Sequence, residues 1–93
     1  MTPRAKAVYS RLTEALSPGY LDVIDDSMAH AEHAGAMRGG GGHFYAVIVA
    51  EAFAGKTPVQ RHQLVYQALA DLLRSDIHAF SMKVYTTTEY QSL

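Results

Sequence analysis

Residues 43–51, with the sequence HFYAVIVAE, form the clearest β-strand in this chain. Most of their side chains are aromatic or β-branched, which are the residue types that strands favour. Both faces of this strand are largely apolar, as is typical of a central strand that is covered on at least one side. We therefore expect residues 43–51 to lie in the middle of a sheet.

The residues that follow predict a turn, a helix and a further strand. The turn is Phe53–Lys56 (FAGK), and Thr57 can then cap a helix that has Pro58 at its first position. Apolar side chains recur along this helix at the spacing of one buried stripe, until residues 75–76 end it: Leu64, Val65, Ala68, Leu69, Leu72 and Leu73. A last strand, from about His78 to Tyr85, alternates apolar and polar side chains.

The N-terminal residues predict a helix and a strand. Thr2 can cap a helix that begins at Pro3, residues 17–19 end that helix, and Tyr20–Asp25 is a short strand candidate. Residues 86–93 can add one helical turn after the last strand. The first two strands can pair antiparallel, and a helix between the second and third favours a right-handed parallel crossover. We therefore predict an α/β (α+β) fold of order α-β-β-α-β, with a three-stranded mixed sheet and helices packed on one face.

A chain of 93 residues, 48% of them hydrophobic, is long enough for one globular domain, which we expect to span residues 1–93. The net charge of −1 provides no general attraction to nucleic acid or to an anionic membrane. No apolar run is long enough to cross a bilayer, and no apolar signal-peptide core follows residues 1–6. We expect a soluble protein of the cytoplasm, or of an organelle after removal of a transit peptide.

The absence of cysteine limits the chemistry open to the chain. Disulfides, zinc–thiolate sites and thiol catalysis are excluded for this chain alone, so soft-metal chemistry needs histidine or the thiolates of a partner. The glycine run 39–42 does not resemble a phosphate-binding loop, because no Lys-Ser/Thr pair or helix follows it. No Ser/His/Asp set has an interpretable context. We therefore expect a protein that is not an enzyme.

Four of the five histidines are expected to meet at one end of the sheet. Residues 26–42 connect the first two strands without helical or strand periodicity, and they hold His30 and His33. His43 and His78 begin the second and third strands, which start at the same end if they are parallel neighbours. Such a group could bind Zn²⁺, Cu²⁺ or iron. The simpler interpretation is that the two loop histidines are solvated, that His78 is a hydrogen-bonded residue at a strand end, and that His43 is a loop or strand-edge residue.

Several ordered motifs resemble the BolA family, and together they cover nearly the whole chain. Residues 43–49 (HFYAVIV) are similar to the family's HF-x-V-x-V-V strand, and residues 53–56 (FAGK) to its F-x-G turn. Residues 60–66 (QRHQLVY) match its R-H-[RQ]-x-[VI] helix start, and residues 77–82 (IHAFSM) its [VI]-H-A-[LF] segment. Residues 25–30 (DDSMAH) resemble the D-[ED]-S-x-x-H segment before its variable loop.

The resemblance implies a fold similar to class II K-homology domains and a role in iron–sulfur cluster trafficking and iron regulation with monothiol glutaredoxins. In such complexes a glutaredoxin cysteine and glutathione hold one side of a [2Fe-2S] cluster, and the BolA partner supplies the other ligands. Here the resemblance implies His78 and His30, with His33 or His43 as alternates to His30. Two thiolates with two imidazoles form a Rieske-like ligand set. Alone, the chain is expected to be a monomer without a cluster.

Nucleic-acid binding is the alternative, since the family also includes transcriptional regulators. K-homology domains clamp the nucleic-acid backbone with a G-x-x-G loop, whereas residues 55–58 here, GKTP, lack the second glycine. Four basic residues could still form a weak patch for DNA or RNA: Lys56, Arg61, Arg74 and Lys83. We rank DNA or RNA binding second, and a mononuclear metal site or a scaffold role third.

Overall fold

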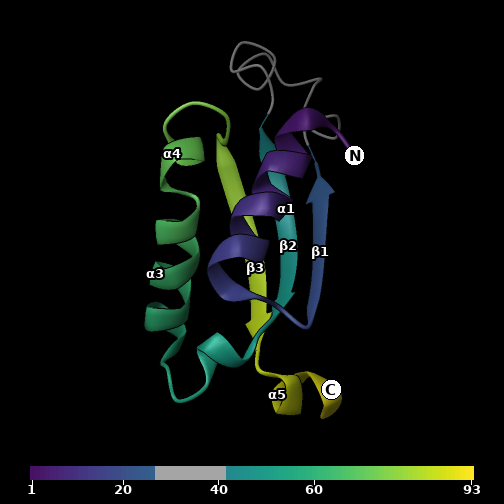
Figure 1. Cartoon of the computed structure of the whole chain (residues 1–93), viewed down its shortest axis with the longest axis vertical. Helices are drawn as coiled ribbons and strands as arrows, with labels where there is room; N and C mark the ends of the chain where they lie inside the picture. Colours follow the sequence, from purple (N-terminus) through teal and green to yellow (C-terminus); the bar gives the residue numbers. More distant parts are fainter. Residues whose placement is uncertain (27–41) are drawn as a thin grey trace.

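The computed structural model describes residues 1–26 and 42–93, which form an α+β fold with a three-stranded sheet (Figure 1). Within these two ranges, no helix has the length and the apolar character needed to cross a lipid bilayer. The elements follow in chain order: α1 (Pro3–Leu16), β1 (Tyr20–Asp25), β2 (His43–Val49), the 3₁₀ helix η2 (Glu51–Phe53), α3 (Pro58–Ala68), α4 (Ala70–Leu73), β3 (Ala79–Tyr85) and α5 (Thr87–Gln91).

The sheet has the order β1-β2-β3, with β2 in the centre as predicted. β1 and β2 pair antiparallel, and Asp25 lies opposite Phe44. β2 and β3 pair parallel, and His43 lies opposite Ala79. β1 therefore ends where β2 and β3 begin, at the top of Figure 1. The predicted mixed sheet, with one antiparallel and one parallel pair of strands, is confirmed.

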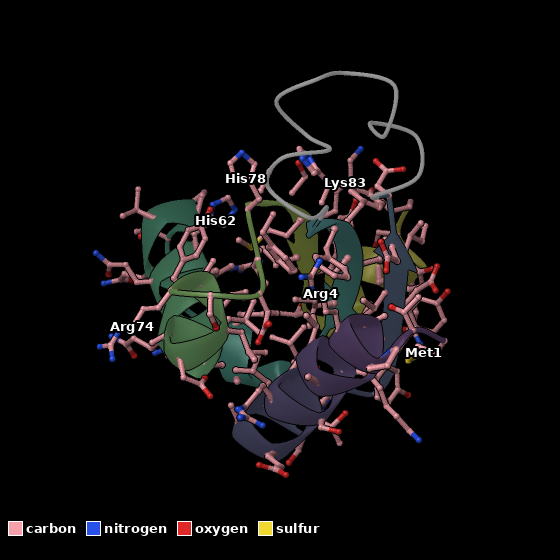
Figure 2. All side chains as sticks on the ribbon, turned by 90° about the horizontal axis from the view of Figure 1, so that it is seen from above. Met1, Arg4, His62, Arg74, His78 and Lys83 are labelled. Carbon is pink, nitrogen blue, oxygen red and sulfur yellow. The ribbon has the colours of Figure 1, made fainter. Side chains whose placement is uncertain are left out.

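Helices α1, α3 and α4 cover one face of the sheet (Figure 2). Alternate side chains of β2 are buried on that face: Phe44 is 3% exposed, and Ala46 and Ile48 are 0% exposed. They share one hydrophobic core with residues of the helices: Ala5, Val8, Leu12, Leu16, Val65, Leu69 and Leu72. The opposite face of the sheet carries exposed side chains such as Ile24 and Lys83. The predicted packing of helices on a single face is therefore confirmed for α1, α3 and α4. The short α5 differs, because the ring of its Tyr90 contacts those of Tyr20 and Tyr85 on the opposite face.

Both long helices begin at the predicted caps. The Thr2 side chain accepts a hydrogen bond from the backbone N–H of Ala5 at 3.2 Å, and Pro3 occupies the first helical position. Thr57 and Gln60 form a capping box, in which each side chain accepts a hydrogen bond from the other's backbone N–H, at 3.1 and 3.0 Å. These bonds satisfy amide groups that have no partner within the first turn of a helix.

The helix predicted up to residue 74 is divided at Leu69 into α3 and α4. Leu69 has φ −102° and ψ 7°, outside the range of an α-helix. Its carbonyl still accepts a hydrogen bond from the N–H of Leu73 at 2.9 Å, so the chain continues in the same direction. Leu69 and Leu72 are 0% and 6% exposed, and both parts of the helix therefore pack against the same core.

Two strands are shorter than predicted. β2 ends at Val49, and residues 51–53 turn away as η2, whose last side chain is 0% exposed. β3 begins at Ala79 rather than at His78. The backbone N–H of His78 instead donates to the carbonyl of Gly42, which precedes the first residue of β2. The end of β2 and the start of β3 thus depend on contacts between distant parts of the folded chain, which the residue pattern does not show.

Candidate functional site

The end of β1 and the starts of β2 and β3 are joined by backbone hydrogen bonds. The N–H of Asp26 donates to the carbonyl of His43 at 2.7 Å. The carbonyl of Gly42 accepts two hydrogen bonds, from the N–H of His78 at 2.8 Å and from that of Ala79 at 3.1 Å. Backbone hydrogen bonds therefore hold the end of β1 and the starts of β2 and β3 together at this end of the sheet.

Two of the histidines predicted to converge are in contact at this end of the sheet. The ring centroids of His43 and His78 lie 5.3 Å apart, with the ring planes tilted by 48°. The His78 side chain is exposed (Figure 2), whereas His43 is partly buried and its Nε2 atom is shielded from solvent. His30 and His33 lie outside the described residues. The site thus places one accessible imidazole beside one enclosed imidazole.

The backbone that carries His78 is firmly anchored. The carbonyl of Leu72 accepts hydrogen bonds from the N–H groups of Asp76 at 2.8 Å and of Ile77 at 2.9 Å. The side chain of Ile77 is buried, at 5% exposed. Nε of Arg4 on α1 lies 4.0 Å from the Asp76 carboxylate. The exposed ring of His78 therefore extends from a backbone that is held immediately before it.

Two imidazoles supply fewer ligands than the four of a closed tetrahedral metal site. Across residues 1–26 and 42–93, no group of three or more His, Asp or Glu side chains is arranged to hold a metal ion. Within these residues, the pair formed by His43 and His78 is therefore not a complete metal site by itself.

His62 is set apart from this pair. It is exposed in the first half of α3. In Figure 1, α3 begins at the end of the molecule away from the starts of β2 and β3. This histidine is therefore a suitable internal control for the other two.

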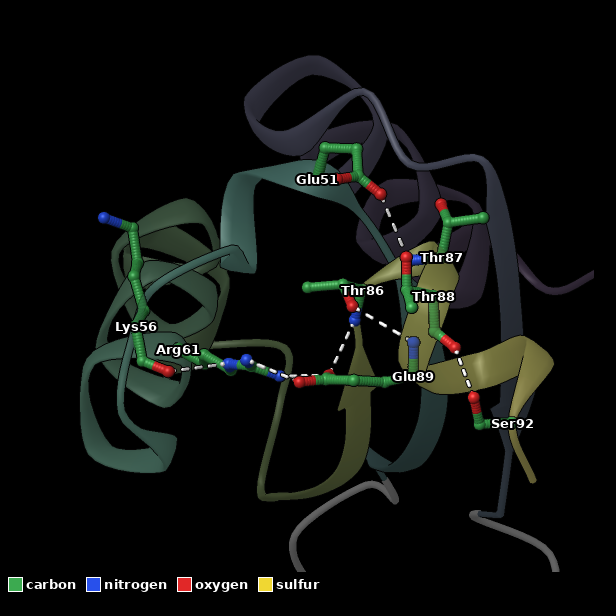
Figure 3. Close-up of polar contacts among 8 residues, drawn as sticks. All are labelled: Glu51, Lys56, Arg61, Thr86, Thr87, Thr88, Glu89 and Ser92. Atoms are coloured by element: carbon green, nitrogen blue, oxygen red, sulfur yellow. Dashed lines mark hydrogen bonds and ion pairs between the residues drawn. The ribbon is translucent and has the colours of Figure 1, made fainter.

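Arg61, one of the basic residues predicted to bind nucleic acid, is engaged within the protein (Figure 3). Its Nη1 and Nη2 atoms donate to the carboxylate oxygens of Glu89 at 2.6 and 3.0 Å, and its Nε donates to the carbonyl of Lys56 at 3.0 Å. The hydrogen bonds from Arg61, with one from the backbone N–H of Thr86, lower the pKa of Glu89 to about 2. The Arg61 side chain is only 13% exposed. The same bonds attach α5, the predicted closing turn, to the start of α3.

The other three basic residues lie on different elements. Lys56 is exposed in the turn before α3, Arg74 follows α4, and Lys83 lies on the open face of β3. Figure 2 shows Arg74 and Lys83 well apart from each other, with Arg74 at the left edge of the view. The structure therefore distributes the predicted patch over separate surfaces.

Gly42 takes part in the site although the sequence did not predict a specific role for it. It is the last of four consecutive glycines, Gly39–Gly42, and its only distinguishing signal is its position before His43. Its hydrogen bonds to the start of β3 form only in the folded chain, because the two segments are distant in sequence.

Comparison with known proteins yields a family match. The family model described as "BolA-like protein" matches residues 12–89. The DNA-binding transcriptional regulator BolA of Vibrio cholerae is 41% identical over 86 residues, which are 92% of this chain and 77% of that protein. SufE-like protein 1, chloroplastic/mitochondrial, of Arabidopsis thaliana is 42% identical over 91 residues, which cover 92% of this chain but only 24% of that protein.

A solved structure has the same arrangement of elements. The BolA domain of SufE1 from Arabidopsis thaliana matches this structure with a TM-score of 0.83 at 38% sequence identity. The alignment covers 96% of this chain and 98% of that domain, so it includes both the sheet and the helices.

Proposed function

Because this chain belongs to the BolA-like protein family, we propose that it binds one side of a [2Fe-2S] cluster whose other side is held by a monothiol glutaredoxin and glutathione. The cluster is the cargo that the complex receives or passes on, and this chain is a binding partner rather than an enzyme. It acts in the cytoplasm or in an organelle, and it is a monomer without a cluster when alone. The observation that carries the proposal is the contact between His43 and His78 at one end of the sheet.

The donor atoms of the chain favour a shared cluster. The 93 residues include no cysteine, so any thiolate ligands must come from another molecule. Thiolates from glutaredoxin and glutathione, with two imidazoles from this chain, would complete a Rieske-like set. A shared cluster accounts for an accessible imidazole, that of His78, in a group of histidines too small to hold a metal by itself.

We assign His78 as one ligand. Its ring is exposed while the backbone before it is anchored, so it can reach a cluster carried by another protein without any unfolding. The family pattern in residues 25–30 assigns the second ligand to His30. His43 is the alternative that the geometry supports, because its ring lies against that of His78. His33 is the remaining alternative.

Visible circular dichroism of a mixture with cluster-loaded monothiol glutaredoxin tests the proposal. A spectrum different from that of the glutaredoxin alone is expected, because imidazole replaces thiolate at the iron. His78→Ala should abolish the difference, whereas the matched control His62→Ala, which removes another exposed histidine, should retain it. Far-UV circular dichroism checks that both variants are folded. An unchanged spectrum with the wild-type protein would overturn the proposal.

DNA binding is the second candidate function, favoured by the name of the Vibrio cholerae relative. We rank it second because the chain has a net charge of −1 and Arg61 is paired with Glu89. Binding through phosphate contacts should weaken steeply with salt and be no tighter than about 10⁻⁶ M. Fluorescence anisotropy with duplexes of different sequence measures this. Tight, sequence-selective binding at physiological salt would place DNA binding first.

A further inference from the structure

Gly42 is enclosed by the segment that carries His78. It is buried, and its carbonyl accepts hydrogen bonds from the N–H of His78 at 2.8 Å and of Ala79 at 3.1 Å. The next residue, His43, lies opposite Ala79 in the parallel ladder. Gly42 therefore contributes to the register of β3 against β2 and to the place where the two histidine rings meet.

The position of Gly42 has no room for a side chain. Its φ is +85°, a conformation that residues other than glycine rarely adopt. A Cβ atom would lie 2.5 Å from the carbonyl oxygen of Asp76 and 3.0 Å from the backbone nitrogen of His78. Real Cβ atoms essentially never approach another atom within 3.0 Å, and the Asp76 oxygen is part of the backbone. A side chain here must therefore displace residues 76–78.

Asp76 and Ile77 are also anchored by contacts that do not involve Gly42. The N–H groups of Asp76 and Ile77 both donate to the carbonyl of Leu72, and the Ile77 side chain is part of the core. Moving this segment would weaken these hydrogen bonds or the packing of Ile77. Because His78 belongs to the same segment, a displacement also disturbs the hydrogen bond from its N–H to the carbonyl of Gly42, and with it the position of the His78 ring.

We propose that Gly42 is a positioning residue for His78, holding the backbone of that ligand where its ring meets His43. This inference rests on the proposed function and deepens it, by naming the residue that presents the ligand to the cluster. Gly42 itself need not contact the cluster. Groups that orient a metal ligand from outside the coordination sphere commonly contribute roughly 10- to 100-fold to metal affinity.

The test compares Gly42→Ala with the matched control Gly55→Ala. Gly55 also has a positive φ, +72°, but a Cβ atom there would meet nothing within 4 Å. Both variants therefore place alanine in a strained conformation, and only Gly42→Ala displaces residues 76–78. NMR spectra of the cluster-free proteins report the position of His78. Visible circular dichroism of mixtures with cluster-loaded glutaredoxin reports the complex, and thermal unfolding reports the strain.

We expect both variants to unfold at lower temperature than the wild type. Gly42→Ala should also shift the amide resonances of residues 76–79, remove nuclear Overhauser effects between the rings of His43 and His78, and weaken the complex by roughly 10- to 100-fold. Gly55→Ala should leave these signals and the complex unchanged. A folded Gly42→Ala with wild-type resonances and affinity would overturn the inference, as would equal weakening by both variants.

Hydrogen exchange of the wild-type protein decides the matter if Gly42→Ala does not fold. The amides of His78 and Ala79 should be protected, because both donate to Gly42. Exchange as fast as that of exposed amides would overturn the inference. If the wild-type mixture shows no new cluster spectrum, the proposed function fails, whereas the resonances of Gly42→Ala still show whether Gly42 positions His78.

Discussion

Arg11 on α1 and Asp71 on α4 form an ion pair across the helical layer, with Nη2 2.7 Å from Oδ2 and Nε 3.4 Å from Oδ1. A second pair, between Arg61 and Glu89, joins α3 to α5. Each arginine binds its carboxylate through two nitrogens, which fixes the orientation of the pair as well as strengthening it. The helices are thus connected by charged groups at the outer surface, in addition to their shared core.

These pairs predict that acid destabilises the fold. Hydrogen bonds from Arg61 lower the pKa of Glu89 from the usual 4.5 to about 2, and those from Arg11 lower the pKa of Asp71. A carboxylate whose pKa is lowered by folding contributes stability above its unfolded pKa and loses it as the pH falls toward the folded value. The midpoint temperature of thermal unfolding should therefore decrease as the pH is lowered from about 4.5 to about 2.

The variant Glu89→Gln tests how much the ion pair between Arg61 and Glu89 contributes to the loss of stability in acid. The variant should unfold at lower temperature than the wild type at pH 7, and its midpoint should vary less in acid, because the carboxylate that titrates is gone. Glu14→Gln, which removes another exposed carboxylate, is the control. Parallel curves for Glu89→Gln and the wild type would show that the ion pair does not contribute to acid sensitivity.

Leu12→Ala should destabilise the protein strongly. The side chain of Leu12 on α1 is 0% exposed, and its truncation should lower the free energy of unfolding by about 2–5 kcal/mol, because it removes buried apolar surface and leaves a cavity. The control Val59→Ala, at a side chain 66% exposed, should change that free energy by less than about 0.5 kcal/mol. Urea unfolding followed by far-UV circular dichroism measures both, and equal effects would contradict the described core.

Single histidine substitutions should identify the second cluster ligand. We expect His30→Ala to weaken the glutaredoxin complex more than His33→Ala or His43→Ala does. Relative to the wild type, the loss of affinity should exceed the roughly 10- to 100-fold that is typical of losing a group that only orients a ligand. Titration of each variant with cluster-loaded glutaredoxin measures the affinity. If His43→Ala is the most damaging of the three, the ligands are the two histidines whose rings are in contact.

The complex should loosen in mild acid while the protein alone stays folded. An imidazole must be neutral to bind iron, so protons compete with the cluster for histidine ligands, and histidine changes charge between about pH 5 and pH 8. The visible spectrum of the mixture should decay between about pH 7.5 and about pH 5.5. Far-UV circular dichroism of the cluster-free protein should stay constant, because His78 is exposed rather than part of the core. A constant visible spectrum would argue against histidine ligands.

The starts of the helices could be predicted because their signals act over a few residues. Thr2 with Pro3, and Thr57 with Pro58, stabilise the first turn of their own helix without help from the rest of the chain. The position of the break in the long helix could not be predicted in this way. The break at Leu69 falls within a continuous apolar stripe, and its side chain is buried in the common core.

Element order alone was enough to bring His43 and His78 to one end of the sheet, because parallel neighbouring strands begin at the same edge. The family-like motifs and the lack of any cysteine follow from amino-acid order in the same way. The partner of Arg61 and the fit of Gly42 against residues 76–78 were settled only by folding. Both depend on atoms from distant parts of the chain that meet within a few ångströms, and residue types and their spacing do not specify such distances.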